Sequence, residues 1–499
     1  MYLLGVDIGS YSTKGVLLSE AGEVVAVAVQ PHEMRVPGPG LAEHDADQDW
    51  WGGFCSVTRQ LLQKTAIDPT QIASVGCSGI GPCMLPVDAA GRALRPAVLY
   101  GVDTRSKDEI VELTQRYGAE FIMRHSGMPL TTQAVGPKVL WLARHEPEIF
   151  SKAARIVGCP TYLVQRLTGA CVVDHYGAAN YAPFYDVEKL AWDRAQTSDI
   201  CSPDLLPEAR WTCEVAGQVH EAAASQTGLS AGTPVIVGTV DAAAEATSVG
   251  VLGHGDLMAM YGTSVFFIQV VPELQRDVRR WSAPYLFPGT WAAMGAVSTG
   301  GALTHWFRRE LTQLDDREAG FAILQAEAER SPPGSNGLIA LPYFSGERTP
   351  LNDPLARGMF FGLDLTHTRA DMYRSLLEGV AHASRHNLDM FDQGFPASAI
   401  YAVGGGVNNA LWMQASVDIA GKPQRIRQQT VGAAMGSAFL AGIGVGVFQS
   451  GDIERINPVA REIVPRASCR ARYDKDHRIF LQLYESTRHL MAELGGAPR

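Results

Sequence analysis

A short turn rich in hydroxyl side chains, set between two strands, occurs at the start of the chain and again near its middle. Short apolar segments predict strands at residues 2–6 and 15–18, joined by a turn at residues 7–13. Strands are also predicted at residues 256–261 and 265–271, joined by the turn at residues 262–264. Apolar strands then alternate with helical patterns, which is typical of α/β organisation. The recurrence predicts a duplicated α/β fold of two lobes with a cleft between them.

The chain has 499 residues, which is enough for two or three domains. We place the boundary between the two predicted halves after residue 247. This gives an N-terminal lobe of residues 1–247 and a C-terminal lobe of residues 248–499.

Charge and cysteine usage exclude several classes of function. Lys and Arg number 42 against 52 Asp and Glu, a net charge of −10, so binding to nucleic acid or to an anionic membrane is not expected. The eight cysteines are isolated and Asp7 comes too early for a signal peptide, which predicts a cytoplasmic protein. Residues 431–448 carry no charge, but they contain many small residues and predict a buried helix.

The first turn has the composition of a phosphate-binding loop. Glycine allows the backbone to approach a polyanion, hydroxyls and amides donate to phosphate oxygens, and a lysine supplies positive charge. Asp7 would repel phosphate, so we expect it to hold Mg²⁺ through water. The alternative is an ordinary β-turn rich in turn-forming residues. The phosphate-binding residues predicted here are Gly9, Ser10, Ser12, Thr13 and Lys14.

Two further glycine-rich turns favour nucleotide binding. The turn at residues 262–264 is weak evidence for phosphate binding by itself, but together with the turn at residues 7–13 it would form a phosphate clamp. Residues 404–409 follow a predicted strand and precede a predicted helix, so their amides would lie at a helix N-terminus. They do not match G-x-G-x-x-G, which disfavours a Rossmann dehydrogenase, and a plain connecting loop is the alternative. The residues predicted to bind nucleotide are Gly262, Thr263, Ser264, Gly404, Gly405, Gly406, Asn408 and Asn409.

Asp241 ends the apolar run of residues 234–240 and precedes a predicted helix. Its functional interpretation is a general base that takes a proton from a substrate hydroxyl as it attacks phosphorus. The structural alternative is a helix N-cap.

Several longer motifs resemble those of the FGGY carbohydrate kinases. The most specific is Gly358-x-Phe360-x-Gly362-Leu363, followed seven residues later by residues 371–378. Residues 138–145 fit the second part of the family's N-terminal signature, although Gln133 and Val135 depart from its start. Residues 341–350 and the turn at residues 404–409 are similar to xylulokinase-like members. Matching stretches extend from Tyr2 to about Gly446.

This resemblance implies two actin-like, ribonuclease H-like ATPase lobes and the cofactors ATP and Mg²⁺. It implies that Asp241 is the base and that Gly300 and Gly301 form a further nucleotide-side turn. The expected activity is phosphorylation of a hydroxyl of a ketopentose or related sugar or polyol, with D-xylulose as the best single candidate. A homodimer is consistent with the family. The alternatives are an actin- or Hsp70-like ATPase and a sugar-binding regulator without kinase turnover.

The sugar side departs from the xylulokinase pattern. Gly81 and Pro82 stand where such members carry a Met-His pair, and Ala242 stands where an Asn usually follows the base. These losses weaken D-xylulose as the substrate, because hydroxyl-matched polar groups discriminate sugars strongly. A solvated surface ion pair is the alternative for Asp103 and Arg105. The predicted substrate-binding residues are Ser78, Gly79, Gly81, Pro82, Asp103, Arg105, Gln133 and Asp241.

Overall fold

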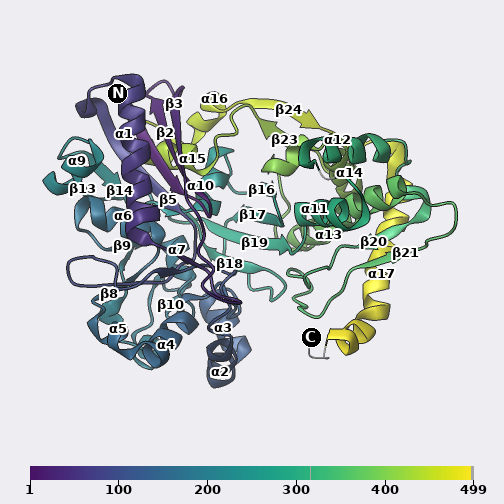
Figure 1. The fold of residues 1–499 in the computed structure, drawn as a ribbon, viewed down its shortest axis with the longest axis horizontal. Coiled ribbons are helices and arrows are strands. Elements are labelled where there is room, and N and C mark those ends of the chain that lie inside the picture. Colours follow the sequence, from purple (N-terminus) through teal and green to yellow (C-terminus); the bar gives the residue numbers. More distant parts are fainter. Residues whose placement is uncertain (315, 496–499) are drawn as a thin grey trace. The chain divides into compact units, whose positions relative to one another are not determined.

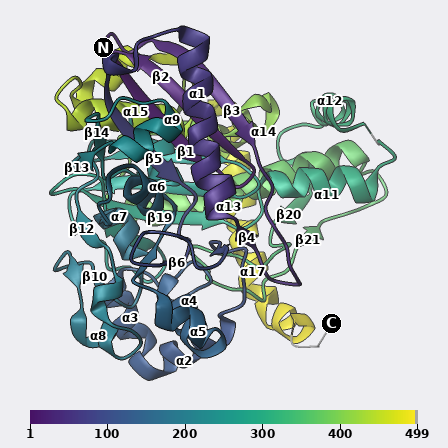
Figure 2. The ribbon, with the colours of Figure 1, turned by 60° about the vertical axis from the view of Figure 1, so that its left-hand side comes forward.

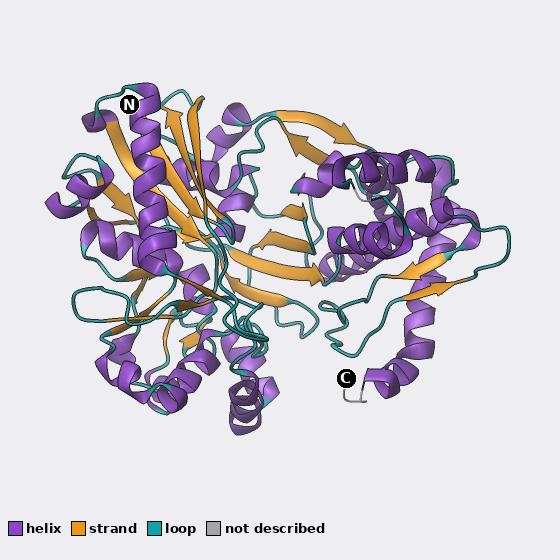
Figure 3. Ribbon diagram, viewed as in Figure 1, coloured by secondary structure: helices purple, strands orange, loops and turns teal. Residues whose placement is uncertain are grey.

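The computed structural model describes residues 1–314 and 316–495, in which helices and strands form two compact units and the strands include two seven-stranded sheets (Figures 1 and 3). This confirms the α/β prediction. The first unit comprises Met1–His254, Val270–Ala292 and Val431–Pro458, and the second comprises Gly255–Gln269, Ala293–Thr430 and Val459–Arg499. A boundary between lobes after residue 247 stays a prediction.

The first sheet begins with the antiparallel meander that the sequence predicts. Strand β1 pairs antiparallel with β2 and parallel with β5, and the sheet order is β13-β14-β5-β1-β2-β3, with β15 also paired to β5. The carboxyl ends of β1, β5 and β15 therefore lie at one edge. The strands are β1 (Tyr2–Ile8), β2 (Ser12–Ser19), β3 (Val24–Pro31), β5 (Ile72–Gly79), β13 (Val215–Gln218), β14 (Pro234–Ile236) and β15 (Thr239–Val240).

The second sheet repeats this plan. Strand β16 pairs antiparallel with β17 and parallel with β22, in the order β18-β19-β17-β16-β22-β23-β24. The run β19-β17-β16-β22-β23 corresponds to β3-β2-β1-β5-β14, which is the duplication predicted from the two hairpins. The strands are β16 (Asp256–Tyr261), β17 (Val265–Val271), β18 (Trp281–Pro284), β19 (Trp291–Val297), β22 (Ala399–Val403), β23 (Gln424–Arg427) and β24 (Val459–Ile463).

Two helices cover opposite faces of the first sheet. Gly15 faces α1 (Gly53–Thr65), since a Cβ there would lie 2.9 Å from Leu61, and Gly5 faces α15 (Ala433–Gly444). In Figure 2, α1 runs across the strands of this meander. Residues Ala433 to Gly442 are buried, which confirms the predicted buried helix. Among the described residues, no helix is long and apolar enough to cross a membrane.

The apolar run at residues 234–240 is not one strand, as the sequence predicted, but two. It breaks at Gly238, which has a φ of 75° and packs so closely on β5 that a Cβ would lie 2.2 Å from the Cys77 carbonyl oxygen. Helix α10 (Asp241–Ser248) then begins at Asp241 itself, and its N-cap is Val240. The N-cap alternative for Asp241 is therefore wrong.

The other principal helices are divided between the two units. Each of the eight cysteines is a free thiol, as their isolated positions predict. The principal helices of the first unit are α2 (Lys107–Tyr117), α3 (Ala119–Ser126), α4 (Val135–His145), α6 (Cys159–Thr168), α7 (His175–Ala179) and α9 (Glu221–Thr227). Those of the second are α11 (Gly301–Leu311), α12 (Arg317–Ala328), α13 (Arg369–Gly394), α14 (Ala410–Ala420) and α17 (Arg470–Gly495).

Candidate active site

Asp7 and Lys14 lie opposite one another where strands β1 and β2 meet the first turn. Because side chains alternate along a strand, both share the face that Gly5 presents to α15. Ser78, at the same level on β5, donates from Oγ to Asp7 Oδ1 at 2.7 Å. Burial raises the pKa of Asp7, whereas the Ser78 hydrogen bond and the charge of Lys14 act in the opposite direction. The sheet therefore presents a partly buried carboxylate with one fixed donor.

Asp241 reaches the same sheet edge from a different strand. Strand β15 pairs with Ser78 and Gly79 at the end of β5, and Asp241 follows it directly. Its Oδ1 accepts a hydrogen bond from the Ala242 amide at 2.8 Å. Burial, and then the negative charge of Asp7, raise the pKa of Asp241 well above its usual range. The fold thus brings together the two carboxylates that the sequence assigned to catalysis and magnesium.

Glu245 is a third carboxylate of this site, which the sequence prediction missed. It lies four residues after Asp241, on the same face of α10. Burial and the charge of Asp7 raise the pKa of Glu245 to about 7, against the opposing effect of Lys14. Its Oε2 lies so close to Gly432 that a Cβ there would be 2.7 Å away, and it accepts a hydrogen bond from the Ala433 amide. The spacing of four residues was the available signal.

The N-terminal end of α15 is held by two charged groups of the site. Lys14 Nζ donates to the Val431 carbonyl at 3.0 Å, and Glu245 accepts from the Ala433 amide. These bonds link β2, α10 and α15, so the charged groups have fixed positions relative to each other.

The first turn orients its hydroxyls in different directions. The Gly9 amide donates to the Ser12 carbonyl at 2.8 Å, and Ser10 Oγ is 3.0 Å from the Tyr100 hydroxyl. Thr13 points to the opposite face of the sheet from Asp7 and is fully buried, where its hydroxyl donates to the Asp49 carbonyl. Thr13 can therefore offer only backbone groups to a ligand on the Asp7 face, while Ser10 and Ser12 remain partly exposed.

A cavity of about 420 Å³ in the second unit gathers most of the predicted nucleotide residues. The Gly300 and Gly301 amides donate to the Thr263 and Gly262 carbonyls, both at 2.8 Å, so the two turns form one surface. Ser264, Gly300 and Gly404 belong to the same turns without lining the cavity. Asn409 also caps α14, since its side chain accepts from the Trp412 amide at 3.0 Å. Predicted residues in the lining are Gly262, Thr263, Gly301, Gly405, Gly406, Asn408 and Asn409.

The other walls of this cavity come from residues that the sequence did not single out. They are contributed by strand β16 and by helices α11, α12, α13 and α14, and several are aromatic, which suits the flat face of a base. Apart from Tyr373, which lies within the motif at residues 371–378, no short motif marks them, because they meet only in the folded unit. They are Tyr261, Thr304, His305, Phe321, Gln325, Tyr373 and Trp412.

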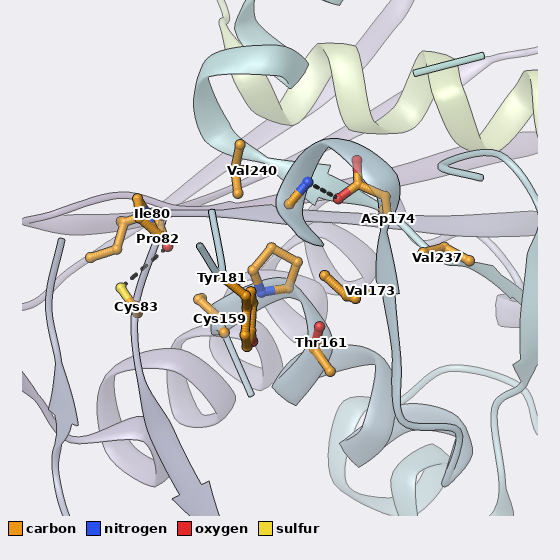
Figure 4. Close-up of a pocket in the computed structure, with 15 residues that line it drawn as sticks. Ile80, Pro82, Cys83, Cys159, Thr161, Val173, Asp174, Tyr181, Val237 and Val240 are labelled. Carbon is orange, nitrogen blue, oxygen red and sulfur yellow. Dashed lines mark hydrogen bonds between the residues drawn. The ribbon is translucent and has the colours of Figure 1, made fainter. Parts of the chain in front are cut away.

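The loop after β5 borders a small, largely apolar cavity in the first unit. Its volume is about 20 Å³, which is room for about one water molecule. Gly81 and Pro82 line it, and Gly81 is packed so closely that a Cβ would lie 2.5 Å from Val240 Cγ1. Figure 4 shows Ile80, Pro82, Tyr181 and Val240 around this space. The loop thus offers few side-chain hydrogen bonds beyond the Ser78 hydroxyl.

Asp103 and Arg105 belong to a buried ion-pair network and not to a solvated surface pair. Asp103 is fully buried and accepts from the Ala42 amide at 2.7 Å, and Arg105 Nη2 donates to Asp103 at 2.7 Å and to Glu43 at 2.8 Å. Gln133 lies beside Gly101 in the adjoining loop, so close that a Cβ on that glycine would lie 2.4 Å from Gln133 Nε2. The charged groups of Asp103 and Arg105 therefore have most of their hydrogen-bond partners within the protein.

Lys138 lies beneath these loops at the start of α4, and the sequence identifies it only as part of a motif. Its fully buried ammonium donates to the Thr132 carbonyl at 2.6 Å. Burial lowers the pKa of Lys138 to about 8, while Cys83 and Asp103 oppose that change.

Comparison with family models matches nearly the whole chain. Residues 2–249 match the N-terminal domain of the FGGY family of carbohydrate kinases, and residues 257–445 match its C-terminal domain. A xylulose kinase of Escherichia coli is 32% identical over 99% of this chain and 100% of that protein. A gluconokinase of Bacillus subtilis is 27% identical over 92% of this chain and 90% of that protein.

Solved structures agree with these matches. The crystal structure of a xylulose kinase from Rhodospirillum rubrum superimposes with a TM-score of 0.93 at 32% identity, and covers 98% of this chain and 100% of that one. The prediction of a fold with actin-like ATPase lobes is confirmed by this likeness.

Proposed function

Because the chain belongs to the FGGY family of carbohydrate kinases, we propose that it transfers the terminal phosphoryl group of ATP to a hydroxyl of a ketopentose or related polyol. D-xylulose is the best single acceptor. The observation that carries the proposal is the pair of Asp7 and Asp241 at one sheet edge, each with its pKa raised by burial.

Asp241 acts as the general base. A carboxylate that is buried beside a second negative charge holds a proton more tightly than one in water, which favours proton transfer from a sugar hydroxyl. The Ala242 amide binds Oδ1 at 2.8 Å, and this bond leaves Oδ2 available to accept a proton. As the acceptor oxygen attacks phosphorus, its proton moves to the Asp241 carboxylate.

Asp7 fits a magnesium ion held through water. Mg²⁺ usually keeps several waters and uses one or two carboxylates together with substrate phosphates. When bound, Mg²⁺ would neutralise charge on the phosphate oxygens. Ser78 orients the Asp7 carboxylate for this task, and Lys14 supplies a fixed positive charge beside it. Among the described residues there is no cluster of three or more side chains suited to enclose a metal by themselves.

The nucleotide binds in the cavity of the second unit. Its volume of about 420 Å³ and its aromatic and amide lining suit an adenosine group, and the Gly300 and Gly301 amides hold the turn at residues 262–264 in place by donating to its carbonyls. The first turn supplies amides and the Ser10 and Ser12 hydroxyls to the transferred phosphate.

The acceptor remains a choice within small sugars and sugar acids. Xylulose kinases among the relatives favour D-xylulose, whereas the similarity to a gluconokinase makes gluconate the second candidate. The loop with Gly81 and Pro82 presents few polar side chains, and the Asp103 and Arg105 charges are largely satisfied within the protein. Such a site would discriminate between acceptors less sharply than one lined by free polar groups.

The test is ADP release across a panel of pentuloses, hexuloses, polyols and gluconate, with the wild type and Asp241→Asn. Strong stimulation by one acceptor supports the kinase and names its substrate. Asn keeps the shape of the side chain and can still accept from Ala242, so Mg·ADP binding should persist while kcat falls at least 10²-fold to 10⁴-fold. Basal hydrolysis that no acceptor stimulates would favour an ATPase or a regulator, and full turnover in the variant would remove Asp241 from the base role.

A further inference from the structure

His44 is a fully buried histidine that contacts the backbone of the first turn, residues 7–13. It belongs to β4 (Glu43–His44), and its Nε2 is 3.1 Å from the Ser10 carbonyl oxygen. Its Nδ1 is 3.1 Å from Nε1 of Trp50, which is also fully buried. The imidazole therefore bridges the buried tryptophan and the backbone of the turn.

The two partners determine which nitrogen of His44 carries the proton. The indole N–H of Trp50 can only donate, so Nδ1 must accept; the carbonyl of Ser10 can only accept, so Nε2 must donate. Neutral imidazole with its proton on Nε2 satisfies both contacts. Burial lowers the pKa of His44 to about 4, which keeps this neutral form at ordinary pH.

Fixing the Ser10 carbonyl also fixes the direction of the next amide. The peptide between Ser10 and Tyr11 is planar and trans, so its N–H points opposite to its C=O. With the carbonyl directed at His44, the Tyr11 N–H points away from the core. Within residues 1–314 and 316–495, neither the Ser10 nor the Tyr11 amide has a hydrogen-bond acceptor. Consecutive free amides in a turn form a concave anion site.

We propose that His44 is a positioning residue that holds the Ser10 peptide so that the amides of the first turn face the phosphate of the bound nucleotide. This inference rests on the proposed function, because it takes the first turn as a phosphate site. The Tyr100 hydroxyl restrains the Ser10 side chain at 3.0 Å, so His44 and Tyr100 together leave this residue little freedom. The conformational entropy of the turn is then lost during folding and not during nucleotide binding.

Two substitutions of His44 separate its two hydrogen bonds. In His44→Gln the side-chain amide reaches the position of Nε2 and can still donate to Ser10. In His44→Asn the shorter side chain places an acceptor near Nδ1 for Trp50 but cannot reach Ser10. Trp50→Phe removes the indole donor and leaves the Ser10 bond, so it serves as a third variant with a milder change.

The measurements are calorimetric titration with Mg·ADP and the KM for ATP. A lost hydrogen bond predicts that His44→Asn binds Mg·ADP about five- to tenfold more weakly, with a similar rise in KM for ATP and little change in KM for the acceptor. His44→Gln and Trp50→Phe should stay within about threefold of the wild type. Neither KM nor a dissociation constant depends on the fraction of protein that is folded.

Equal weakening in His44→Gln and His44→Asn would overturn the inference, because the Ser10 bond would then not be the cause. Unchanged binding in His44→Asn would overturn it as well. If no acceptor stimulates turnover but the wild type binds Mg·ADP, the proposed function fails while the titration still decides the role of His44. A wild type that binds no Mg·ADP would overturn both.

Discussion

Removing the Ser78 hydroxyl should change the charge state of Asp7. Its 2.7 Å hydrogen bond favours the ionised carboxylate against burial, which raises the pKa of Asp7. A hydrogen bond to a charged group contributes about 1.5–3 kcal/mol, and about 1.4 kcal/mol corresponds to one pKa unit. Ser78→Ala should therefore raise the pKa of Asp7 by about one to two units. Since the proposed metal role needs the ionised form, the acidic limb of activity should move to higher pH.

The assay is the pH profile of kcat/KM for ATP between about pH 5 and 9 at saturating Mg²⁺. Ser74→Ala is the matched control: Ser74 lies on the same face of β5, is also fully buried, and its Oγ has no hydrogen-bond partner among the described residues. Because Asp7 and Asp241 interact, the limb reports the pair and not one group alone. An unmoved limb in folded Ser78→Ala, or an equal movement in Ser74→Ala, would refute the reasoning.

Two further substitutions test the neighbouring charge and the nucleotide cavity. Glu245 has its pKa raised from 4.5 to about 7, so the folded state retains a proton that the unfolded state releases, and stability falls as pH rises through that window. Glu245→Gln should remove this dependence. The thermal midpoint of the variant minus that of the wild type should therefore rise by several degrees between pH 5 and 8, and a constant difference would contradict the prediction. A Cβ on Gly405 meets open space in the cavity, whereas one on Gly406 would lie 2.6 Å from Trp412. Gly405→Ala should weaken Mg·ADP binding without a loss of thermal stability, and Gly406→Ala should lower the thermal midpoint; the reverse pattern would contradict the assigned cavity.

The hairpins and their duplication could be predicted from sequence because they depend on local patterns. Strands at residues 256–261 and 265–271 match β16 and β17 residue for residue, and the glycine-rich turn at residues 404–409 lies between a strand and a helix as expected. Apolar periodicity and turn-forming residues are read within a few positions. Asp241 was also identifiable, because it directly follows a buried strand.

Other features depend on contacts between distant segments and could not be predicted. The break at Gly238 follows from its approach to the Cys77 carbonyl on β5, far away in sequence. The orientation of Thr13 depends on pairing register: one residue along the strand from Lys14, its side chain lies on the other face. The spacing from Asp241 could indicate that Glu245 shares its helix face, but the hydrogen bond from the Ala433 amide depends on a segment far away in sequence.

Close packing of α15 explains how these distant groups meet. On β1 a Cβ at Gly5 would lie 2.0 Å from the Ala434 carbonyl oxygen, and on β5 a Cβ at Gly76 would lie 2.1 Å from the Ser437 carbonyl oxygen. Any side chain at either position would push the helix away from the sheet. Because the Val431 carbonyl must come within 3.0 Å of Lys14 Nζ, that displacement would separate the lysine from its partner. The two glycines therefore contribute to the charge arrangement of the site without contacting any ligand.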